Sequence, residues 1–401
     1  FVPGLLPQEK ARIRVILAKK SFAIGKVLER LTDSPQRVKA PCPVFGKCGG
    51  CALQDLNYEQ QLAWKTDWMK RKFAGIEVRD ILGMRDPYRY RNKAQFPVQV
   101  TEQGQVITGF YRPNSHTIVD TDTCLIQDER LNELYQYIRK ALTPETAAGL
   151  RHIFLRRSRK TGQSQVVLIG EENHFRELTS QLVRRFPELV SVVFNHNSRN
   201  DNVILGEEYD VLHGSDSIEE DSLGIRIRLH FKSFFQVNPE MMEVLYKTAL
   251  EAADIQPGDR VIDMYSGTGT LGLLAARQGA SVTGVEIVPE AVDNARHNAR
   301  LNGIDNADFR CQDASAFAKE NQEPADVLIV DPPRKGLSEQ GIRDIVRISP
   351  KRIVYVSCGP NTLKRDLERF AQGGWQARWI QPVDMFCQTP NVEAVCLLEK
   401  E

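Results

Sequence analysis

Residues 259–272, DRVIDMYSGTGTLG, decide the fold of this 401-residue chain. The segment DRVIDMY predicts a buried strand, and the glycine-rich stretch after it predicts a tight turn into a helix over residues 270–278. Further strands are predicted at ASVTGVEI (280–287), ADVLIVDPP (325–333) and RIVYVSC (352–358), with a helix over residues 289–303. This alternation predicts an α/β fold, a mainly parallel Rossmann-like sheet that binds ligands at the carboxyl ends of its strands.

The glycine loop fits the pattern G-x-G-x-x-G through Gly267, Gly269 and Gly272, with Tyr265 directly before it. Dinucleotide-binding enzymes share this short pattern, so by itself it is weak evidence for a ligand. Glu286 ends the next predicted strand, where a carboxylate suits the ribose hydroxyls of several cofactors. In a purely structural interpretation, the glycines serve only a tight strand-to-helix turn.

Acidic residues near the loop favour one cofactor over another. Asp263 precedes the loop, Asp313 follows a later element, and Asp331 ends the strand at 325–333. A ring of carboxylates repels the pyrophosphate of NAD but attracts the amino and sulfonium groups of S-adenosylmethionine (SAM). The sequence therefore predicts a SAM site.

Two motifs at strand ends indicate the chemistry. In DPPRKG (331–336), two prolines fix the backbone beside Asp331, as in the substrate loops of methyltransferases that act on flat nitrogen heterocycles. Arg334 stands where amino-group methyltransferases place an aromatic residue, which argues against N-methylation. Cys358 ends another strand; a lone cysteine is more often a packing residue, but beside a SAM site it suits nucleophilic catalysis. A thiolate that adds to carbon 6 of a pyrimidine activates carbon 5, and a base must then remove the carbon 5 proton.

Charge is distributed unevenly along the chain. Residues 1–100 carry 19 Lys/Arg and 9 Asp/Glu, whereas the other 301 residues carry 34 and 43. A basic N-terminal quarter and an acidic remainder suggest that the N-terminal part binds a polyanion such as RNA. A basic surface that only faces solvent would have the same composition. The chain has no run of about 20 apolar residues, so no membrane association is expected. Eight cysteines at uneven spacing in a long chain favour a reducing cytoplasm.

Two regions precede the α/β domain. Residues 1–40 alternate in short apolar runs, which predicts strands of a small N-terminal β-barrel. Residues 41–230 mix a helical segment with several short strands, which predicts a mixed α+β domain. Two of its segments, 85–96 and 151–160, interleave cations with aromatic residues and suit contacts with RNA phosphates and bases. The α/β domain is expected to span residues 231–401.

Three cysteines crowd the stretch CPVFGKCGGC at residues 42–51, with a fourth downstream. A reducing cytoplasm argues against disulfide bonds between these cysteines. The alternatives are a four-cysteine zinc site and a four-iron, four-sulfur cluster. Zinc sites commonly carry a second close pair of cysteines, whereas only Cys124 follows here. Radical SAM chemistry fits poorly, because the SAM loop lies more than 200 residues away. The four candidate ligands are Cys42, Cys48, Cys51 and Cys124.

The motifs together resemble a known family. FFQVN (234–238), YSGTGTLG (265–272), DPPRKG (331–336), YVSCGPNT (355–362) and VDMFCQTPNVEA (383–394) follow one another in order. With the cysteine cluster, they resemble the bacterial RNA uracil-C5 methyltransferases, particularly the iron–sulfur branch that acts on 23S ribosomal RNA. The resemblance covers nearly the whole chain and implies a class I SAM-dependent methyltransferase fold.

The resemblance implies roles at individual positions. Cys358 matches the nucleophile, Glu393 the base, and Asp331 a partner of both the uracil ring and SAM. The matched cofactor contacts are Gln236, Tyr265, Gly267, Gly269, Glu286, Asp313 and Asp331. The four cysteines match ligands of a [4Fe-4S] cluster, which makes residues 41–230 an iron–sulfur domain, and residues 1–40 resemble most of a TRAM domain without its opening strands. We expect a monomer that binds RNA.

Three positions depart from the family pattern. Cys387 and Asn391 replace a proline and a histidine in the last motif, and Gly359 stands where asparagine is usual. A histidine-assisted proton relay is therefore not implied for this chain. Methylation of cytosine or an amino group, a tRNA substrate, and an RNA-binding protein with a degenerate methyltransferase fold stay open as alternatives.

Overall fold

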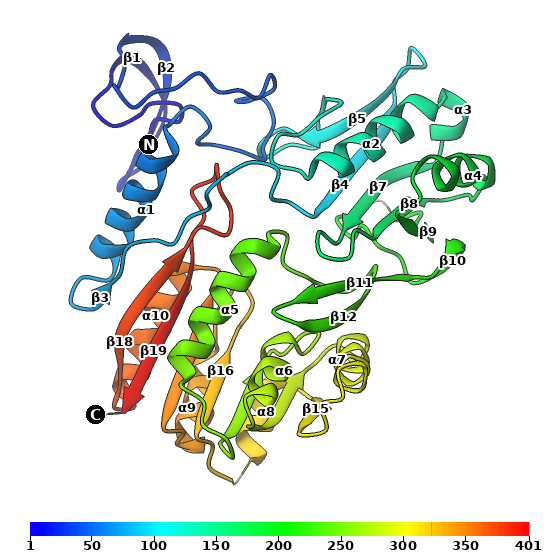
Figure 1. The fold of residues 1–401 in the computed structure, drawn as a ribbon. Coiled ribbons are helices and arrows are strands. Elements are labelled where there is room, and N and C mark those ends of the chain that lie inside the picture. Colours follow the sequence, from blue (N-terminus) through cyan, green and yellow to red (C-terminus); the bar gives the residue numbers. More distant parts are fainter. Residues whose placement is uncertain (200, 322, 401) are drawn as a thin grey trace.

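The computed structural model of the chain describes residues 1–199, 201–321 and 323–400. Figure 1 shows an N-terminal hairpin, a central sheet with helices on its outer side, and a larger sheet with helices on both faces. None of the described helices combines the length and the apolar character needed to cross a bilayer.

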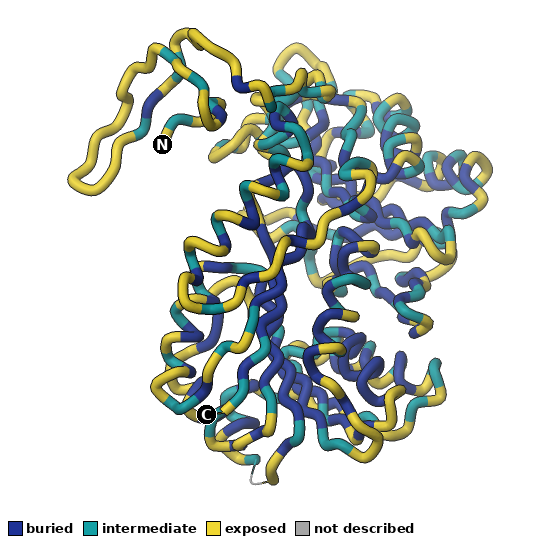
Figure 2. The backbone as a smooth tube through the Cα atoms, turned by 60° about the vertical axis from the view of Figure 1, so that its left-hand side comes forward, coloured by how far each residue is buried: buried dark blue, intermediate teal, exposed yellow. Residues whose placement is uncertain are grey.

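The N-terminal region forms a hairpin. β1 (Lys10–Ala18) pairs antiparallel with β2 (Ala23–Thr32), and this sheet has only two strands. The expected strands are confirmed, but residues 1–40 do not form the expected β-barrel. Alternating apolar residues predict strands, whereas closing a barrel requires further strands to pair with both edges. In Figure 2 the hairpin extends away from the body and is mostly exposed.

A seven-stranded sheet forms the centre of the chain, in the order β10-β9-β8-β7-β4-β5-β6. Its pairs are antiparallel except for β8 and β9. Its helices pack on one face over an apolar core that includes Phe96, Tyr135 and Leu182. The strands are β4 (Lys93–Val100), β5 (Val106–Tyr111), β6 (Ile118–Asp120), β7 (Leu150–Arg157), β8 (Ser164–Gly170), β9 (Leu189–His196) and β10 (Tyr209–Gly214), and the helices are α2 (Glu129–Ala141), α3 (Pro144–Ala147) and α4 (Arg176–Arg185).

An eight-stranded sheet follows, in the order β15-β14-β13-β16-β17-β19-β18-β3. The first five strands in this order are parallel, which confirms the predicted Rossmann-like α/β arrangement. β19 runs antiparallel between β17 and β18, a pairing that the sequence patterns did not reveal. The strands are β3 (Glu77–Val78), β13 (Arg260–Met264), β14 (Ser281–Glu286), β15 (Ala307–Cys311), β16 (Val327–Val330), β17 (Arg352–Ser357), β18 (Trp375–Val383) and β19 (Glu393–Lys400).

Helices cover both faces of this sheet, because its strands are apolar on both sides. In β16, Val327 and Ile329 pack into one core, whereas Leu328 and Val330 pack into the other. The first core holds α5 (Pro239–Ala253), α6 (Thr270–Arg277), α7 (Pro289–Leu301) and the hairpin of β11 (Ser217–Ser222) and β12 (Ile225–His230); the second holds α1 (Tyr58–Lys72), α8 (Ala314–Glu320), α9 (Glu339–Ile348) and α10 (Pro360–Gln372).

The strand order reverses between β13 and β16. The chain moves outward from β13 through β14 to β15, then returns to the other side of β13 with β16 and β17. Loops therefore diverge at the carboxyl ends of β13 and β16 and leave a crevice there, which is where open α/β sheets bind ligands. The predicted motifs at residues 265–272 and 331–336 follow these two strand ends, and Cys358 follows the end of the neighbouring strand β17.

Candidate active site

The glycine loop joins β13 to α6 and has an unusual backbone. Tyr265, Gly267 and Gly269 all have positive φ angles, of 65°, 54° and 83°. A Cβ atom at position 269 would lie 2.8 Å from the Phe309 ring and 2.9 Å from the Cβ of Ala295. Gly269 is therefore required both by the left-handed backbone and by the close approach of α7 and β15.

Two carboxylates hold the loop in place. Asp263, at the buried end of β13, accepts a hydrogen bond from the Gly272 N–H at 2.9 Å. Glu286 accepts from the Gly267 N–H at 3.1 Å and also from the amides of residues 287 and 288. The two acids thus fix the turn as well as placing negative charge beside it.

A cleft opens at the carboxyl ends of β13 and β16. Of the predicted cofactor contacts, Gln236, Tyr265, Gly267 and Asp331 line it. Gly269 is part of the glycine loop, and Glu286 contacts this loop through the Gly267 N–H. Asp313 caps α8 by accepting hydrogen bonds from two backbone amides at 2.9 and 3.0 Å. The remaining lining residues are Phe234, Phe235, Tyr246, Asp263, Ser266, Thr268, Thr270 and Leu271.

Burial makes this cleft electrostatically unusual. It raises the pKa of Asp331 to about 7, and burial together with the charges of Asp331 and Glu286 raises the pKa of Asp263 to about 7 as well. Tyr246 is a cleft residue that the sequence patterns did not single out; burial and the charges of Asp331, Asp263 and Glu393 raise its pKa well above its ordinary value. Burial disfavours the ionised forms of these acids, and a cationic ligand in the cleft would stabilise those forms in place of the missing water.

Strand register brings the predicted nucleophile and base together. β17 and β19 are antiparallel, with Ser357 opposite Ala394, so Cys358 and Glu393 are the next facing positions. Burial and the charges of Glu393 and Asp331 raise the pKa of the Cys358 thiol to about 11, while Arg334 opposes this shift. Burial and Asp331 likewise raise the pKa of Glu393 to about 8, again opposed by Arg334. The four side chains therefore form one electrostatically coupled group.

The three residues that depart from the family pattern, Gly359, Cys387 and Asn391, differ in how tightly the structure surrounds them. A Cβ at Gly359 would lie 2.9 Å from the hydroxyl of Thr362, so the turn after Cys358 is tight. Cys387 is buried, with its sulfur 3.5 Å from the Tyr58 hydroxyl. Asn391 is exposed, and its N–H donates to the Thr389 hydroxyl at 3.2 Å.

The segments expected to face RNA are partly buried. Tyr90 is fully buried and donates to the Cys387 carbonyl at 3.0 Å. Arg156 is also buried, and its guanidinium donates to the carbonyls of His230 and Ser233. These two side chains therefore stabilise the junction between the sheets instead of facing a ligand, whereas Arg89 in the first segment is more than half exposed.

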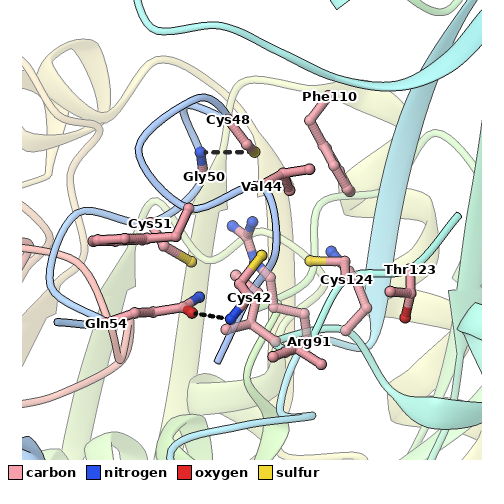
Figure 3. Close-up of a pocket in the computed structure, with 14 residues that line it drawn as sticks. Cys42, Val44, Cys48, Gly50, Cys51, Gln54, Arg91, Phe110, Thr123 and Cys124 are labelled. Carbon is pink, nitrogen blue, oxygen red and sulfur yellow. Dashed lines mark hydrogen bonds between the residues drawn. The ribbon is translucent and has the colours of Figure 1, made fainter. Parts of the chain in front are cut away.

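The four clustered cysteines line one cavity beside the central sheet. Figure 3 shows the sulfurs of Cys42, Cys51 and Cys124 turned toward a common space, with Cys48 above them. All eight cysteines are free. Within residues 1–199, 201–321 and 323–400, no three His, Cys, Asp or Glu side chains are close enough together to hold one metal ion. Burial raises the pKa of the Cys51 thiol to about 11 and that of Cys124 to about 12.

Comparison with known proteins identifies the family. The family profile described as tRNA (uracil-5-)-methyltransferase matches residues 57–401. The chain belongs to this family. It is therefore a SAM-dependent RNA uracil-C5 methyltransferase, in agreement with the cleft and the residues around Cys358.

Relatives and a solved structure resemble the chain over almost its full length. An uncharacterised RNA methyltransferase of Halalkalibacterium halodurans is 42% identical over 420 residues, covering 100% of this chain and 92% of its own. One of Clostridium tetani is 40% identical, with coverages of 99% and 91%. The structure of the Pyrococcus abyssi tRNA (uracil-54, C5)-methyltransferase with S-adenosyl-L-homocysteine has a TM-score of 0.78 at 26% identity and covers 99% and 95% of the two chains.

The buried acids predict that SAM binding by this uracil-5-methyltransferase depends on pH. The pKa values of Asp263 and Asp331, about 7, exceed those of unfolded aspartates, so the free protein loses stability as pH rises through 7. Cationic SAM favours the ionised forms; its affinity should therefore increase roughly tenfold between about pH 6 and about pH 7.5, with proton release. Calorimetry in buffers of different ionisation enthalpy measures both effects.

The matched variant for this prediction is Asp263→Asn, which should flatten the pH dependence. A SAM affinity that falls over the same pH interval would contradict the prediction.

Proposed function

We propose that the enzyme methylates carbon 5 of a uridine in folded RNA through a covalent bond between Cys358 and carbon 6. The thiolate adds to carbon 6, and the π electrons of the ring move toward carbon 5 and oxygen 4. SAM would supply the methyl group that carbon 5 attacks, with its sulfur–methyl bond breaking and S-adenosylhomocysteine as the leaving group. Glu393 then takes the carbon 5 proton, the carbon 5–carbon 6 double bond re-forms, and the bond between carbon 6 and sulfur breaks.

The observation that supports this proposal is the register of β17 against β19: its last pair joins Ser357 to Ala394, the direct chain neighbours of Cys358 and Glu393. Asp331 at the end of β16 lines the cleft and also acts on both catalytic groups, so it suits a contact between the ring and the cofactor. The charge of Arg334 acts on both Cys358 and Glu393, so it suits stabilisation of the negative charge that the ring develops. Burial raises the pKa of both groups, so the Cys358 thiol must lose its proton to water when it adds to carbon 6, and Glu393 must be ionised to accept the carbon 5 proton.

The proposed SAM contacts are those inferred from the motifs. Gln236, Tyr265, Gly267 and Asp331 line the cleft directly, which supports their assignment. Glu286 Oε1 accepts two backbone N–H groups and Oε2 accepts one, so a lone pair on Oε2 stays free for a ribose hydroxyl. Burial, with the charge of Asp313 as the next cause, raises the pKa of Tyr265 to about 12; this proximity to Tyr265 supports the assignment of Asp313.

We propose 23S ribosomal RNA as the substrate, with tRNA as the alternative. The first rests on the motif resemblance, whereas the structurally similar archaeal enzyme is named for uracil 54 of tRNA. The protein should be incubated with SAM and each RNA transcript, followed by digestion and nucleoside mass spectrometry. New 5-methyluridine in 23S rRNA alone supports the proposal; in tRNA alone it favours the alternative; 5-methylcytidine or a methylated amino group would contradict uracil chemistry.

We also propose that Cys42, Cys48, Cys51 and Cys124 hold a [4Fe-4S] cluster. A cluster is larger than a single ion, so its thiolates need not meet at one point. The lining supplies apolar side chains such as Val44 and Phe110, together with the cation Arg91, whose buried Nε finds no partner in the described chain. A positive charge facing the cavity suits a cluster that is anionic overall with four thiolates. The cluster supplies structural cross-linking of residues 42–51 to residue 124.

Replacing Cys124 with serine tests the cluster. The variant should lose the brown colour and most of its iron, because one of four thiolate ligands is removed and the cavity offers no substitute. Iron and sulfide analysis of anaerobically purified protein measures this, with the exposed Cys311→Ser as the matched control. Zinc in place of iron in the wild-type protein would contradict the cluster.

The remaining assignments complete the proposal. Residues 1–40 form a TRAM-like RNA-binding unit, residues 41–230 the iron–sulfur RNA-binding domain, and residues 231–401 the methyltransferase domain. The enzyme acts as a monomer in the cytoplasm; its eight free cysteines fit a reducing compartment.

A further inference from the structure

The loop that delivers the base Glu393 has a strained residue at its centre. Residues 384–392 connect β18 to β19, and Glu393 is the first residue of β19. Gln388, five residues before the base, is buried and has a φ of 67°. A residue other than glycine keeps this left-handed conformation only where its surroundings hold it there.

The groups that hold Gln388 come from the segment directly after the third clustered cysteine. The Gln388 carbonyl accepts hydrogen bonds from the Ala52 N–H at 2.9 Å and from the Leu53 N–H at 3.0 Å. Its side-chain oxygen accepts from Gln61 Nε2 at 2.9 Å. Ala52 follows Cys51 in the chain, so the cysteine segment and the catalytic loop meet here.

Gln61 joins these two segments. From the buried face of α1, its Nε2 lies 2.9 Å from the Leu53 carbonyl and 2.8 Å from the Leu56 carbonyl, in addition to its contact with Gln388. Three acceptors around one amide group fix its orientation, since only a donor satisfies them. An apolar side chain at position 61 would remove the donor to the Leu56 carbonyl and to the Gln388 side-chain oxygen, whereas the Leu53 carbonyl would still accept from the Leu56 N–H.

The start of the same loop has an independent anchor. Asp384 is fully buried and pairs with Lys65 Nζ at 2.5 Å, and it also accepts from the Tyr58 hydroxyl at 2.8 Å. These contacts fix the loop where it leaves β18. Asn238 and Tyr90 donate to the carbonyls of Met385 and Cys387 in the first half of the loop. Among the described residues, the contacts of Gln388 are the last hydrogen bonds from outside the loop before Glu393.

We propose that Gln61 and Gln388 are positioning residues for Glu393, so that the segment after Cys51 sets the geometry of the base. This inference rests on the base role proposed for Glu393. Cys358 follows β17 and is not part of the loop, so its addition to carbon 6 should not depend on the loop. Removal of the carbon 5 proton does depend on the loop, because the loop leads directly into Glu393. A loosened loop should therefore slow elimination selectively and leave the methylated RNA attached to Cys358.

The variant Gln61→Leu tests this inference. We expect turnover to fall roughly 10- to 100-fold, because a small displacement of a catalytic group has effects of this size. The enzyme should accumulate a methylated RNA–protein adduct that survives denaturing electrophoresis. Gln60→Leu is the matched control on the same helix, because the Gln60 side chain makes no hydrogen bond within the described chain; it should behave as the wild type.

A second variant separates positioning from folding. Gln388→Gly keeps the left-handed backbone and the carbonyl that accepts from Ala52 and Leu53, and removes only the contact with Gln61. It should show the same adduct at a lower level. Lost turnover without adduct in both variants, or wild-type behaviour of folded Gln61→Leu, overturns the inference.

Glu393→Gln, measured in parallel, separates this inference from the proposed function. An adduct in Glu393→Gln but in neither glutamine variant overturns positioning alone. If Glu393→Gln shows no adduct either, the base assignment fails and the positioning inference fails with it.

Discussion

Replacing Cys358 with alanine is expected to abolish RNA methylation while leaving SAM binding intact. The thiol has no substitute, because carbon 5 of uracil is too weak a nucleophile to attack the methyl group before a nucleophile adds to carbon 6. Loss of a covalent nucleophile typically lowers turnover by roughly 10⁴-fold or more. The side chain does not line the cleft that contains Tyr265 and Gly267, so SAM affinity should not change. Nucleoside mass spectrometry and SAM calorimetry measure the two properties.

The same variant should fail to form a covalent complex with RNA that contains 5-fluorouridine. In the wild-type protein, fluorine at carbon 5 blocks the final elimination, so the adduct should persist on a denaturing gel. Cys311→Ala is the matched control, since Cys311 is an exposed cysteine at the end of β15. Residual methylation in Cys358→Ala would assign the nucleophile to another group.

Replacing Glu393 with glutamine should have a different effect, namely accumulation of the covalent adduct. Glutamine fills the same volume at the start of β19 but cannot accept the carbon 5 proton. Loss of a general base typically costs roughly 10²- to 10⁴-fold in rate. The adduct should already carry the methyl group, because the proton is removed after methyl transfer. Mass spectrometry of the gel-shifted complex measures this.

The pH profile provides a control for the role of Glu393. Burial and the neighbouring charge of Asp331 raise the pKa of this carboxyl to about 8, so it is protonated below that pH in the free enzyme. A base acts only when deprotonated, so kcat/KM should increase with pH through about 8. Glu393→Gln should remove the inflection near pH 8, whereas the increase at higher pH from ionisation of the Cys358 thiol, with its pKa of about 11, should remain. A wild-type profile that falls over the same interval would contradict the assignment.

The α/β arrangement was predictable from short-range patterns. Residues 259–358 contain apolar runs that are buried on both faces, and these became β13, β14, β16 and β17 with small shifts at their ends. The patterns did not reveal the position of β19 between β17 and β18. Nor did they indicate that residues 77–78 pair with β18, because such pairing joins segments about 300 residues apart.

The N-terminal region shows the same limit. Alternation in residues 10–32 predicts two strands, and the structure contains them. Whether strands close into a barrel depends on how many of them pair, which alternation does not specify.

By itself, the sequence determined the strand-to-helix turn at Gly267 and Gly269, the placement of Asp331 and Cys358 at strand ends, and the chemistry that these residue types permit. Only the tertiary structure decided which groups act on one another. It placed Glu393 opposite Cys358 through antiparallel register, gathered four cysteines around one cavity, and joined Gln61 to Gln388. The physical reason is that local propensity and periodicity act over a few residues, whereas register and burial are set by packing between distant segments.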